Sequence, residues 1–394
     1  MTTARRRPTT LALAALLLAT AAACQVAAPP DRPARTNAPT PATSSPRGFT
    51  LVASGDVLPH MSIIEKAYVD AGGEGYDFKP MLAGVKPVVS GADLAICHME
   101  TVYGADGNYT GYPSFKSPPQ VAEALAATGY DACSTASNHT LDDGAAGIHR
   151  TLDALDRAGV RHAGSARTAL EESSPTLLRA GTAQVAHLAY TYGTNGIPLP
   201  ADRPWAVDLI DRDRILADAR AARQAGADVV VVSLHWGSEW QDEPDAQQLR
   251  LGEELTAAGA AGRPDIDLIL GTHAHVPQAY EKVNGTWVVY GMGDQIAGTM
   301  FNHSGAEDPR GNQGTLARFT FAPPVHEGAR WEVTEAEFVP QWFDIGAGRV
   351  VNLNSAIASG SGSASGEEVT RVRDRIRDVV LSRGAAQDGL VMGK

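Results

Sequence analysis

The sequence contains few cysteines and few aromatic residues. Only 3 of its 394 residues are Cys, and Phe, Tyr and Trp together make up 6%. No two cysteines form a CxxC pair, which excludes a cysteine-based zinc site of the usual spacing. Cys97 and Cys133 both lie in apolar, strand-like runs. A disulfide would suit an exported protein. Adjacent parallel strands rarely offer the required geometry, however, so we expect two buried free thiols.

Clustered positive charge is also missing from the body of the chain. The formal net charge is -12. No basic patch that could follow a phosphodiester backbone is evident, so we expect no nucleic-acid partner. An apolar content of 43% is that of an ordinary globular core. The length fits one large domain or two ordinary ones, and the sequence shows no internal repeat.

The N-terminus has the pattern of an export signal. Three arginines at positions 5–7 precede a short Leu/Ala run over 11–23. The run is too short to span a bilayer comfortably and ends in small residues, which predicts a signal peptide over 1–23. Cys24 follows three alanines, as the lipidated cysteine of a bacterial lipoprotein does. We expect a membrane lipoprotein facing outside; simple cleavage, giving a secreted protein, is the alternative.

The remaining chain divides by composition into three parts. Residues 24–47 are rich in Pro, Thr, Ala and Ser, which predicts a disordered tether behind the lipid anchor. Residues 48–355 are expected to form the folded domain. Residues 356–394 are expected to hold a Gly/Ser linker, over 358–366, and a C-terminal helix, over 367–383.

Helical and strand-like segments alternate through most of the domain. This alternation predicts an α/β fold with much parallel sheet. After about residue 314 the pattern changes to two alternating runs that predict antiparallel strands. The expected helices cover 63–70, 80–90, 119–128, 145–158, 212–224 and 245–259, and the two late strands cover 315–321 and 331–343.

Potential metal ligands follow five apolar, strand-like runs. They are Asp56, His98 with Glu100, Asn138 with His139, His235, and His273 with His275. Open α/β sheets place their sites outside the carboxyl ends of the strands, so these side chains are expected to converge.

The types of these residues predict a two-metal centre. In an extended backbone, His273 and His275 would point the same way and reach one ion; alone, the pair could equally be loop histidines, and His235 alone could simply cap its strand. The carboxylates of Asp56 and Glu100 can bridge two cations. Oxygen and imidazole ligands together suit two divalent ions, with Mn, Fe or Zn as the candidates. Two such ions activate water and stabilise developing charge, which predicts a hydrolase.

Asn138 and His139 are expected to have different roles. Asn138 offers a neutral oxygen ligand. His139, as its direct neighbour, cannot easily reach the same ion and is therefore free to act as an acid or to stabilise charge.

These motifs carry a family resemblance. The chain resembles the CapA family of poly-γ-glutamate capsule proteins, a branch of the calcineurin-like metallophosphatase superfamily. The resemblance spans roughly residues 49–300, with the motifs in family order. The matching stretches are 54–60, 93–101, 129–164, 233–239, 271–278 and 290–294.

The resemblance implies a fold and a set of site residues. The implied fold is a four-layer sandwich of two mixed β-sheets flanked by helices. His139 would be the catalytic histidine. The implied metal ligands are Asp56, Glu100, Asn138, His235, His273 and His275.

Further residues extend this set or depart from the family pattern. This chain has His98 where the family usually has Asn, Asp294 where it usually has Asn, and Leu58 where the superfamily's Asp-x-His opening has His. Lys116 also fits the family pattern, which implies a contact with an anionic substrate; the alternative is a solvent-exposed loop lysine. Additional ligands, or groups that orient the ligands, are expected among His60, His98, Asp142, Glu239 and Asp294.

The resemblance implies a cell-surface protein of capsule or poly-γ-glutamate biosynthesis with a dinuclear hydrolase site. Its partners would be an anionic polymer or phosphoester substrate and a membrane-bound polymer synthesis or export complex. One alternative is an extracellular phosphoesterase unrelated to polyglutamate. Another is a non-catalytic accessory subunit of the polymer complex.

Overall fold

The structure is a computed structural model that describes residues 47–105, 107–260, 262–326, 328–360 and 365–394. The expected signal peptide, Cys24 and almost all of the expected tether therefore lie outside the described residues. Within the described residues, no helix has both the length and the apolar character needed to cross a membrane.

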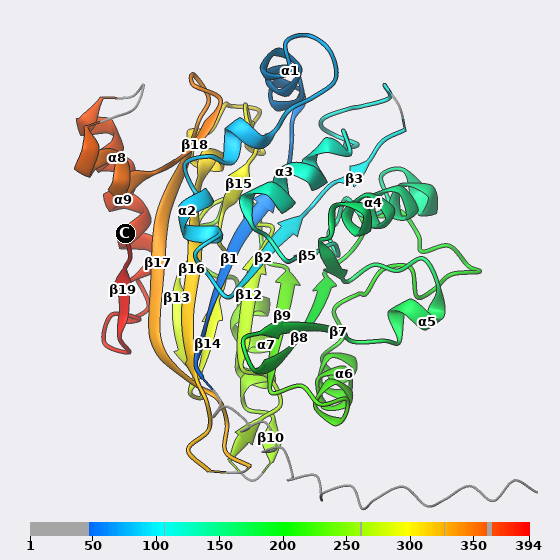
Figure 1. The fold of residues 1–394 in the computed structure, drawn as a ribbon, viewed down its shortest axis with the longest axis vertical. Coiled ribbons are helices and arrows are strands. Elements are labelled where there is room, and N and C mark those ends of the chain that lie inside the picture. Colours follow the sequence, from blue (N-terminus) through cyan, green and yellow to red (C-terminus); the bar gives the residue numbers. More distant parts are fainter. Residues whose placement is uncertain (1–46, 106, 261, 327, 361–364) are drawn as a thin grey trace, which may run out of the picture. The chain divides into compact units, whose positions relative to one another are not determined.

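The first sheet combines strands from the N-terminal and the C-terminal parts of the described chain (Figure 1). Among the described residues, nine strands join in the order β18-β17-β16-β1-β2-β5-β6, with β15 beside β1 and β19 beside β17. The strands β1, β2, β5, β6 and β15 are parallel, whereas β16, β17 and β18 run antiparallel. The bounds are β1 Phe49–Val57, β2 Leu94–Met99, β5 Ala132–Ser134, β6 Arg161–Ala163, β15 Asp294–Ile296, β16 Gln313–Ala322, β17 Glu332–Asp344, β18 Arg349–Asn352 and β19 Leu390–Met392.

The second sheet is formed by strands from the middle of the chain. Six strands of the described chain join in the order β13-β14-β12-β9-β8-β7, and β8, β9, β12 and β14 are parallel. Their bounds are β7 Thr176–Ala180, β8 Ala183–Thr191, β9 Val229–His235, β12 Leu268–Thr272, β13 Tyr280–Val283 and β14 Thr286–Val289. The described residues also form two small two-stranded sheets. One pairs β3 (Val102–Tyr103) with β4 (Lys116–Ser117), and the other pairs β10 (Gly259–Ala260) with β11 (Arg263–Pro264).

The four valines of β9 explain the layering. Val229 and Val231 point into the core between the two sheets, together with Leu51 of β1. Val230 and Val232 point the other way, into a core with helices. Side chains alternate along a strand, so a strand buried on both faces reads as a continuous apolar run.

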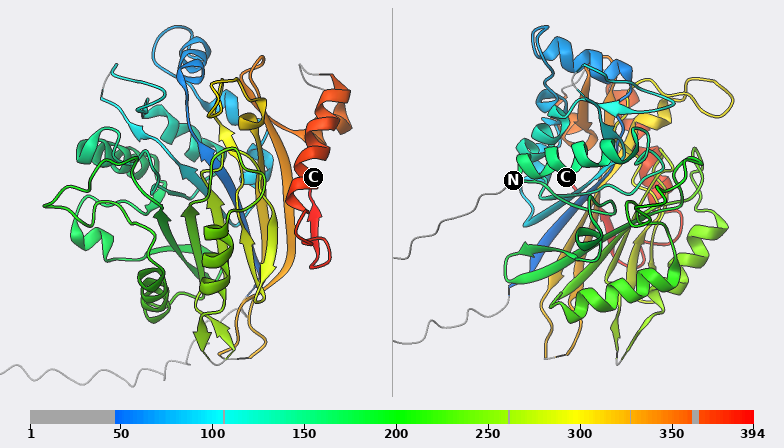
Figure 2. Two further views of the ribbon diagram at one scale, coloured as in Figure 1. Left: turned by 180° about the vertical axis from the view of Figure 1, so that it is seen from behind. Right: turned by 90° about the vertical axis from the view of Figure 1, so that its right-hand side faces the viewer.

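Helices cover the outer faces of both sheets (Figure 2). α3 and α4 pack on the first sheet, and α6 and α7 pack on the second. The α/β fold predicted from the sequence, and the sandwich of two mixed sheets between helices implied by the family resemblance, are confirmed. The bounds are α1 Met61–Asp70, η1 Lys79–Leu82, α2 Lys86–Val89, α3 Gln120–Thr128, α4 Gly144–Ala158, α5 Ala169–Glu172, α6 Arg212–Gln224, α7 Ala246–Thr256 and η2 Pro309–Asn312.

Local signals fix where several helices begin and end. Asp245 and Gln248 form a capping box at the start of α7, which satisfies free N–H groups of the first turn. α3 and α4 end at Gly129 and Gly159, whose φ values of 112° and 81° favour glycine. The single helix expected over 80–90 is instead the two short helices η1 and α2, each with a proline in its first turn.

The C-terminal segment completes the first sheet. α8 (Leu353–Ser359) and α9 (Gly366–Val380) lie beside β17, and β19 pairs with it in parallel (Figure 1). Ala356 and Ile376 join the core between the sheets. Ala358 and Ser359, where the linker was expected to begin, are the last residues of α8, and the middle of that expected linker lies outside the described residues.

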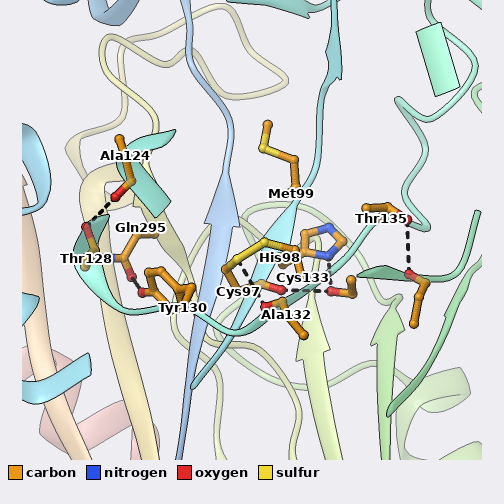
Figure 3. Close-up of a disulfide and its surroundings, with 12 residues drawn as sticks. Cys97, His98, Met99, Ala124, Thr128, Tyr130, Ala132, Cys133, Thr135 and Gln295 are labelled. Carbon is orange, nitrogen blue, oxygen red and sulfur yellow. Dashed lines mark hydrogen bonds between the residues drawn. A yellow bond between two sulfur atoms is a disulfide. The ribbon is translucent and has the colours of Figure 1, made fainter. Parts of the chain in front are cut away.

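The expectation of two free thiols is wrong. Cys97 of β2 and Cys133 of β5 form a disulfide, with their Cα atoms 4.4 Å apart (Figure 3). The two residues are direct register partners on neighbouring parallel strands. That register places the Cα atoms at the short end of the range that a disulfide can bridge, and no sequence signal reports it.

Candidate metal centre

The carboxyl ends of the parallel strands bring the predicted ligands together. In the first sheet, Asp56 of β1 is the register partner of His98 of β2. In the second sheet, His235 of β9 is the register partner of Thr272 of β12. The sheets meet at this edge, where Nδ1 of His235 lies 3.8 Å from Oδ1 of Asp56 and Nε2 lies 3.7 Å from Oε1 of Glu100.

Buried ligand-type side chains form three overlapping groups here. In each group, the potential ligand atoms all lie within 4.8 Å of one another. Asp56 and His275 each belong to two groups, as expected of residues between two cation positions. The groups are Asp56 with His98 and His235, Glu100 with His273 and His275, and Asp56 with His275 and Asp294.

The polar atoms left without partners show that the donor set fits cations. Glu100 is 1% exposed, yet neither of its carboxylate oxygens has a hydrogen-bond partner among the described residues. The same holds for Oδ1 of Asp56 and Oδ2 of Asp294, and for Nε2 of His98. A buried carboxylate without compensation costs several kcal/mol, roughly, in folding free energy. Divalent cations would remove that cost.

The electrostatics of the cluster lead to the same interpretation. Burial raises the pKa of Asp56 and of Glu100, and repulsion from Asp294 and Asp56, respectively, raises it further. Burial likewise raises the pKa of Asp294 to about 6. Burial alone would lower the pKa of His275, but the carboxylates of Asp294 and Glu100 outweigh it and raise that pKa. Ionised carboxylates are therefore disfavoured in this buried cluster unless a nearby positive charge compensates them, and divalent cations would supply that charge.

Hydrogen bonds orient three of the imidazole rings. Nδ1 of His98 lies 2.7 Å from Oγ of Ser134, and Nδ1 of His275 lies 3.0 Å from Oδ1 of Asp294. Nδ1 of His235 lies 3.1 Å from Oγ1 of Thr272. Such contacts fix the tautomer and aim the other nitrogen at a metal. Asp294 therefore has a second possible role, as a ring-orienting group as well as a ligand.

His273 and His275 converge through a turn and not through an extended strand. Their φ values are 95° and 59°, in the left-handed region. Each such residue costs about 1–3 kcal/mol, and strain of this kind concentrates at functional sites. The main chain is held there by the N–H of His273, which donates to Oδ2 of Asp56 at 3.2 Å.

Asn138 and His139 leave the loop after β5 in different directions. Oδ1 of Asn138 lies 2.9 Å from Nε2 of His235, inside the cluster. Nδ1 of His139 lies 2.7 Å from Oδ2 of Asp142, a carboxylate oxygen that also accepts the N–H of Phe115 at 2.6 Å. Because the carboxylate only accepts, Nδ1 of His139 donates, and its Nε2 remains for proton exchange.

A cavity of about 690 Å³ adjoins the cluster. His60, His139, Glu239 and His275 all line it. Nε2 of His60 has no hydrogen-bond partner among the described residues, and burial lowers the pKa of this ring to about 4. Lys116 is not among the lining residues; its Nζ donates to Oδ1 of Asn108 at 3.3 Å.

The loop after β8 also contributes to the site, although no motif in the sequence predicts this. The ring of Tyr192 lies 4.6 Å from that of His273, between ring centres, and Asn195 accepts a hydrogen bond from the side chain of Asn138 at 3.3 Å. The position of this loop could have indicated its role, because it follows the parallel strand β8 just as the predicted ligands follow theirs. Ser134 and Thr272, which orient ligand rings, were not predicted either, although both are polar residues at strand ends.

A family model described as bacterial capsule synthesis protein PGA_cap matches residues 50–299. The chain belongs to this family. The matched range contains all the residues of the cluster and all but a few of those that line the cavity.

The chain spans about half the length of the curated relatives that it matches. A probable polyglutamine synthesis accessory protein of Mycobacterium tuberculosis is 28% identical over 221 residues, which cover 52% of this chain and 55% of that protein. The capsule biosynthesis protein CapA of Bacillus anthracis is 25% identical over 181 residues, covering 45% and 42%. The PGA biosynthesis protein CapA of Bacillus subtilis is 24% identical over 226 residues, covering 54% and 55%.

Two solved structures of bacterial proteins are similar to the chain. A calcineurin-like phosphoesterase of Bacillus subtilis has a TM-score of 0.40 and 15% identity, covering 84% of this chain and 97% of that one. A putative 5'-nucleotidase of Staphylococcus aureus has a TM-score of 0.46 and 15% identity, covering 84% and 58%.

Proposed function

We propose that this PGA_cap-family protein is a metal-dependent hydrolase that acts at the cell surface in capsule or poly-γ-glutamate metabolism. The observation that carries the proposal is Glu100, a buried carboxylate whose two oxygens have no hydrogen-bond partner among the described residues. Imidazoles and carboxylates from both sheets surround it. A structural role alone does not account for such a costly arrangement.

The residues divide into two separate ligand sets, which a third group of Asp56, His275 and Asp294 connects. Asp56, His98 and His235 would hold one divalent cation, and Glu100, His273 and His275 would hold the other. Asn138 lies beside His235 and would contribute a neutral oxygen. When bound, the two ions would polarise the bond to be cleaved and activate water, with Mn, Fe or Zn as the fitting metals.

His139 would supply the acid. It lies in the cavity wall and is not part of any of the three ligand groups. Asp142 holds the ring through Nδ1, which leaves Nε2 for proton transfer. His139 would therefore give its proton to the departing oxygen or nitrogen of a phosphoryl or amide-type bond.

Metal analysis with an activity assay tests this function. The purified protein is loaded with Mn²⁺, its metal content is measured, and hydrolysis of a 4-nitrophenyl phosphodiester is followed. We expect two ions per chain and a turnover that Glu100→Gln abolishes, while the surface control Glu123→Gln retains it. Fewer than one ion per chain, or metal without turnover of the phosphodiester or of a γ-glutamyl amide, would contradict the proposal.

A non-catalytic role is the second candidate, because the Mycobacterium tuberculosis relative is described as an accessory protein. Cells that carry His139→Ala with His273→Ala are compared with cells that lack the protein. If the double variant keeps normal polymer and the deletion loses it, the accessory role is correct. If both lose polymer at equal protein levels, the hydrolase is required.

The cell-surface location is part of the same proposal. It rests on the signal-like run over 11–23 and on Cys24 behind it. Lipid labelling of the wild type and of Cys24→Ala, followed by membrane fractionation, tests it. Label on the wild type alone supports the anchor, and unlabelled protein in the medium supports the secreted alternative.

A further inference from the structure

The cavity beside the metal centre lies on the leaving-group side of the proposed reaction. His139, the proposed acid, is 6% exposed and lines this cavity. Its Nδ1 is held by Asp142, and its Nε2 has no hydrogen-bond partner among the described residues. The group that takes the proton of His139 therefore departs into the cavity. Tyr112 and Phe301 also line it and are 77% and 59% exposed, so a longer chain can extend from it into solvent.

The first turn of α1 forms part of the cavity wall. This helix of 10 residues begins directly after His60, and its first two residues, Met61 and Ser62, line the cavity. The N–H groups of Ile63 and Ile64 donate to the carbonyl of His60. Those of Met61 and Ser62 have no acceptor among the described residues, and the first turn holds no acidic residue and no side-chain cap. Free N–H groups at the positive end of a helix dipole attract an anion.

Gly111 keeps the start of α1 open to a ligand. It belongs to the loop between β3 and β4 and lines the same cavity. A Cβ atom at Gly111 would lie 3.0 Å from the main-chain nitrogen of Met61, so any larger residue would cover that N–H group. Glycine is the residue that allows such a close approach to a backbone.

His60 adds a side-chain donor beside these N–H groups. Its ring lies 4.9 Å from that of Phe115, between ring centres, and Phe115 lies 4.7 Å from His139 by the same measure, so Phe115 contacts both rings. Burial, together with the nearby charges of His275 and His139, lowers the pKa of His60 to about 4, so the ring is neutral near pH 7. His60 belongs to none of the three ligand groups, and its buried Nε2 has no partner among the described residues. A bound substrate is the partner that remains for it.

The charge of the lining is compatible with an anion. Four histidines line the cavity, and Glu239 supplies the one carboxylate among its described residues. Nε2 of His303 lies 3.8 Å from Oε2 of Glu239, so this carboxylate has an imidazole of its own. His275 lines the cavity and belongs to two ligand groups, so the cations of the proposed centre would add positive charge beside it.

We infer that His60 and the first turn of α1 form an anion subsite, which receives a carboxylate carried by the leaving group. The inference rests on the proposed function and narrows its substrate class to an amide whose released amine has a carboxylate on the adjacent carbon. Water adds to the carbonyl carbon, the C–N bond breaks, and the nitrogen takes the proton of His139, which the proton released by the water replaces. A γ-linked glutamate polymer has such a carboxylate on every unit, so the cavity suits the unit that departs.

Two dipeptides that differ in one carboxylate test the inference. They are γ-glutamyl-glutamate and γ-glutamyl-4-aminobutyrate, whose leaving amines differ only in the α-carboxylate, and both are assayed with the Mn²⁺-loaded full chain. We expect kcat/KM for the first to exceed that for the second by about tenfold or more, the effect of hydrogen bonds to one charged group. His60→Ala and Gly111→Ala should each reduce that ratio severalfold. The controls His149→Ala and Gly366→Ala, both outside the cavity, should leave it unchanged.

A wild-type ratio near one, or a ratio that either cavity variant leaves unchanged, overturns the inference and leaves the hydrolase intact. If neither the dipeptides nor the phosphodiester is hydrolysed, the proposed function fails, and binding decides the role of the subsite. Ligand-observed NMR of the metal-free full chain then compares L-glutamate with 4-aminobutyrate. Stronger binding of glutamate, lost in His60→Ala, supports the subsite. Equal binding, or no binding of either compound, overturns it.

Discussion

Nε2 of His98 lies 3.4 Å from Oδ1 of Asp56, on the strand next to it. The other nitrogen of His98 is held by Ser134. Leu58, two residues after Asp56, packs into the wall of the cavity. His98 of β2 therefore places an imidazole beside Asp56. Position 58 of this chain is Leu and offers no ligand there.

Replacing His98 should weaken one metal position. His98→Asn removes the buried nitrogen that faces Asp56, and we expect affinity for one of two ions to fall about 10- to 100-fold. Titration with Mn²⁺ followed by calorimetry checks this, with His149→Asn on α4 as the control. Two unchanged affinities would show that His98 is not a ligand.

Asp142 should act through His139. In Asp142→Asn, the amide can donate to Nδ1 and favour the wrong tautomer, so we expect kcat to fall about 10- to 100-fold. Metal content should not change, because Asp142 is in none of the ligand groups. A shifted pH profile of kcat would identify the effect on proton transfer. Asp143→Asn, whose carboxylate pairs with Arg150 on α4, is the neighbouring control; an equal loss there would indicate a loop effect instead.

The disulfide should stabilise the first sheet beneath the ligands. Cys97 and Cys133 are 36 residues apart in sequence, and closing such a loop is worth about 3–4 kcal/mol of unfolding free energy. Denaturant unfolding of the Cys97→Ala/Cys133→Ala double variant should show that loss. The wild type under reducing conditions should lose a similar amount. A loss in neither case would mean that the strands hold their register without the bond.

Asp208 should give stability a pH dependence outside the metal centre. Burial raises its pKa to about 7, and the paired Arg214 only partly counters this. A raised folded-state pKa contributes stability that is fully present below the unfolded value near about 4 and is lost as pH rises through about 7. Between about pH 5 and about pH 8, the wild type should therefore lose more unfolding free energy than Asp208→Asn. Parallel curves would show that Arg214 compensates the carboxylate fully.

Most of the centre could be predicted because its residues follow parallel strands. Asp56, His98 and His235 were found from an apolar run that ends in a ligand-type residue, a purely local signal. The convergence of His273 and His275 was expected for an incorrect reason, since both residues are in a left-handed turn. Tertiary contacts can impose such a conformation, but the local sequence does not report it.

Contacts between different strands and between the two sheets could not be predicted from local sequence patterns. The pairing of Cys97 with Cys133 depends on the register of β2 and β5, which changes the facing residue with every one-residue shift. The approach of Tyr192 to His273 depends on how the loops after β8 and β12 meet.

The sequence by itself determined the alternation of strands and helices, and the identity of the ligands at the strand ends. Both follow from local chemistry, namely apolar periodicity and the donor atoms of Asp, Glu, Asn and His. Tertiary structure alone decided which of those ligands face one another, that Cys97 and Cys133 are joined, and that a cavity lined by His139 and His275 adjoins the centre. These features depend on strand register and loop packing, which are set by contacts between residues far apart in the chain.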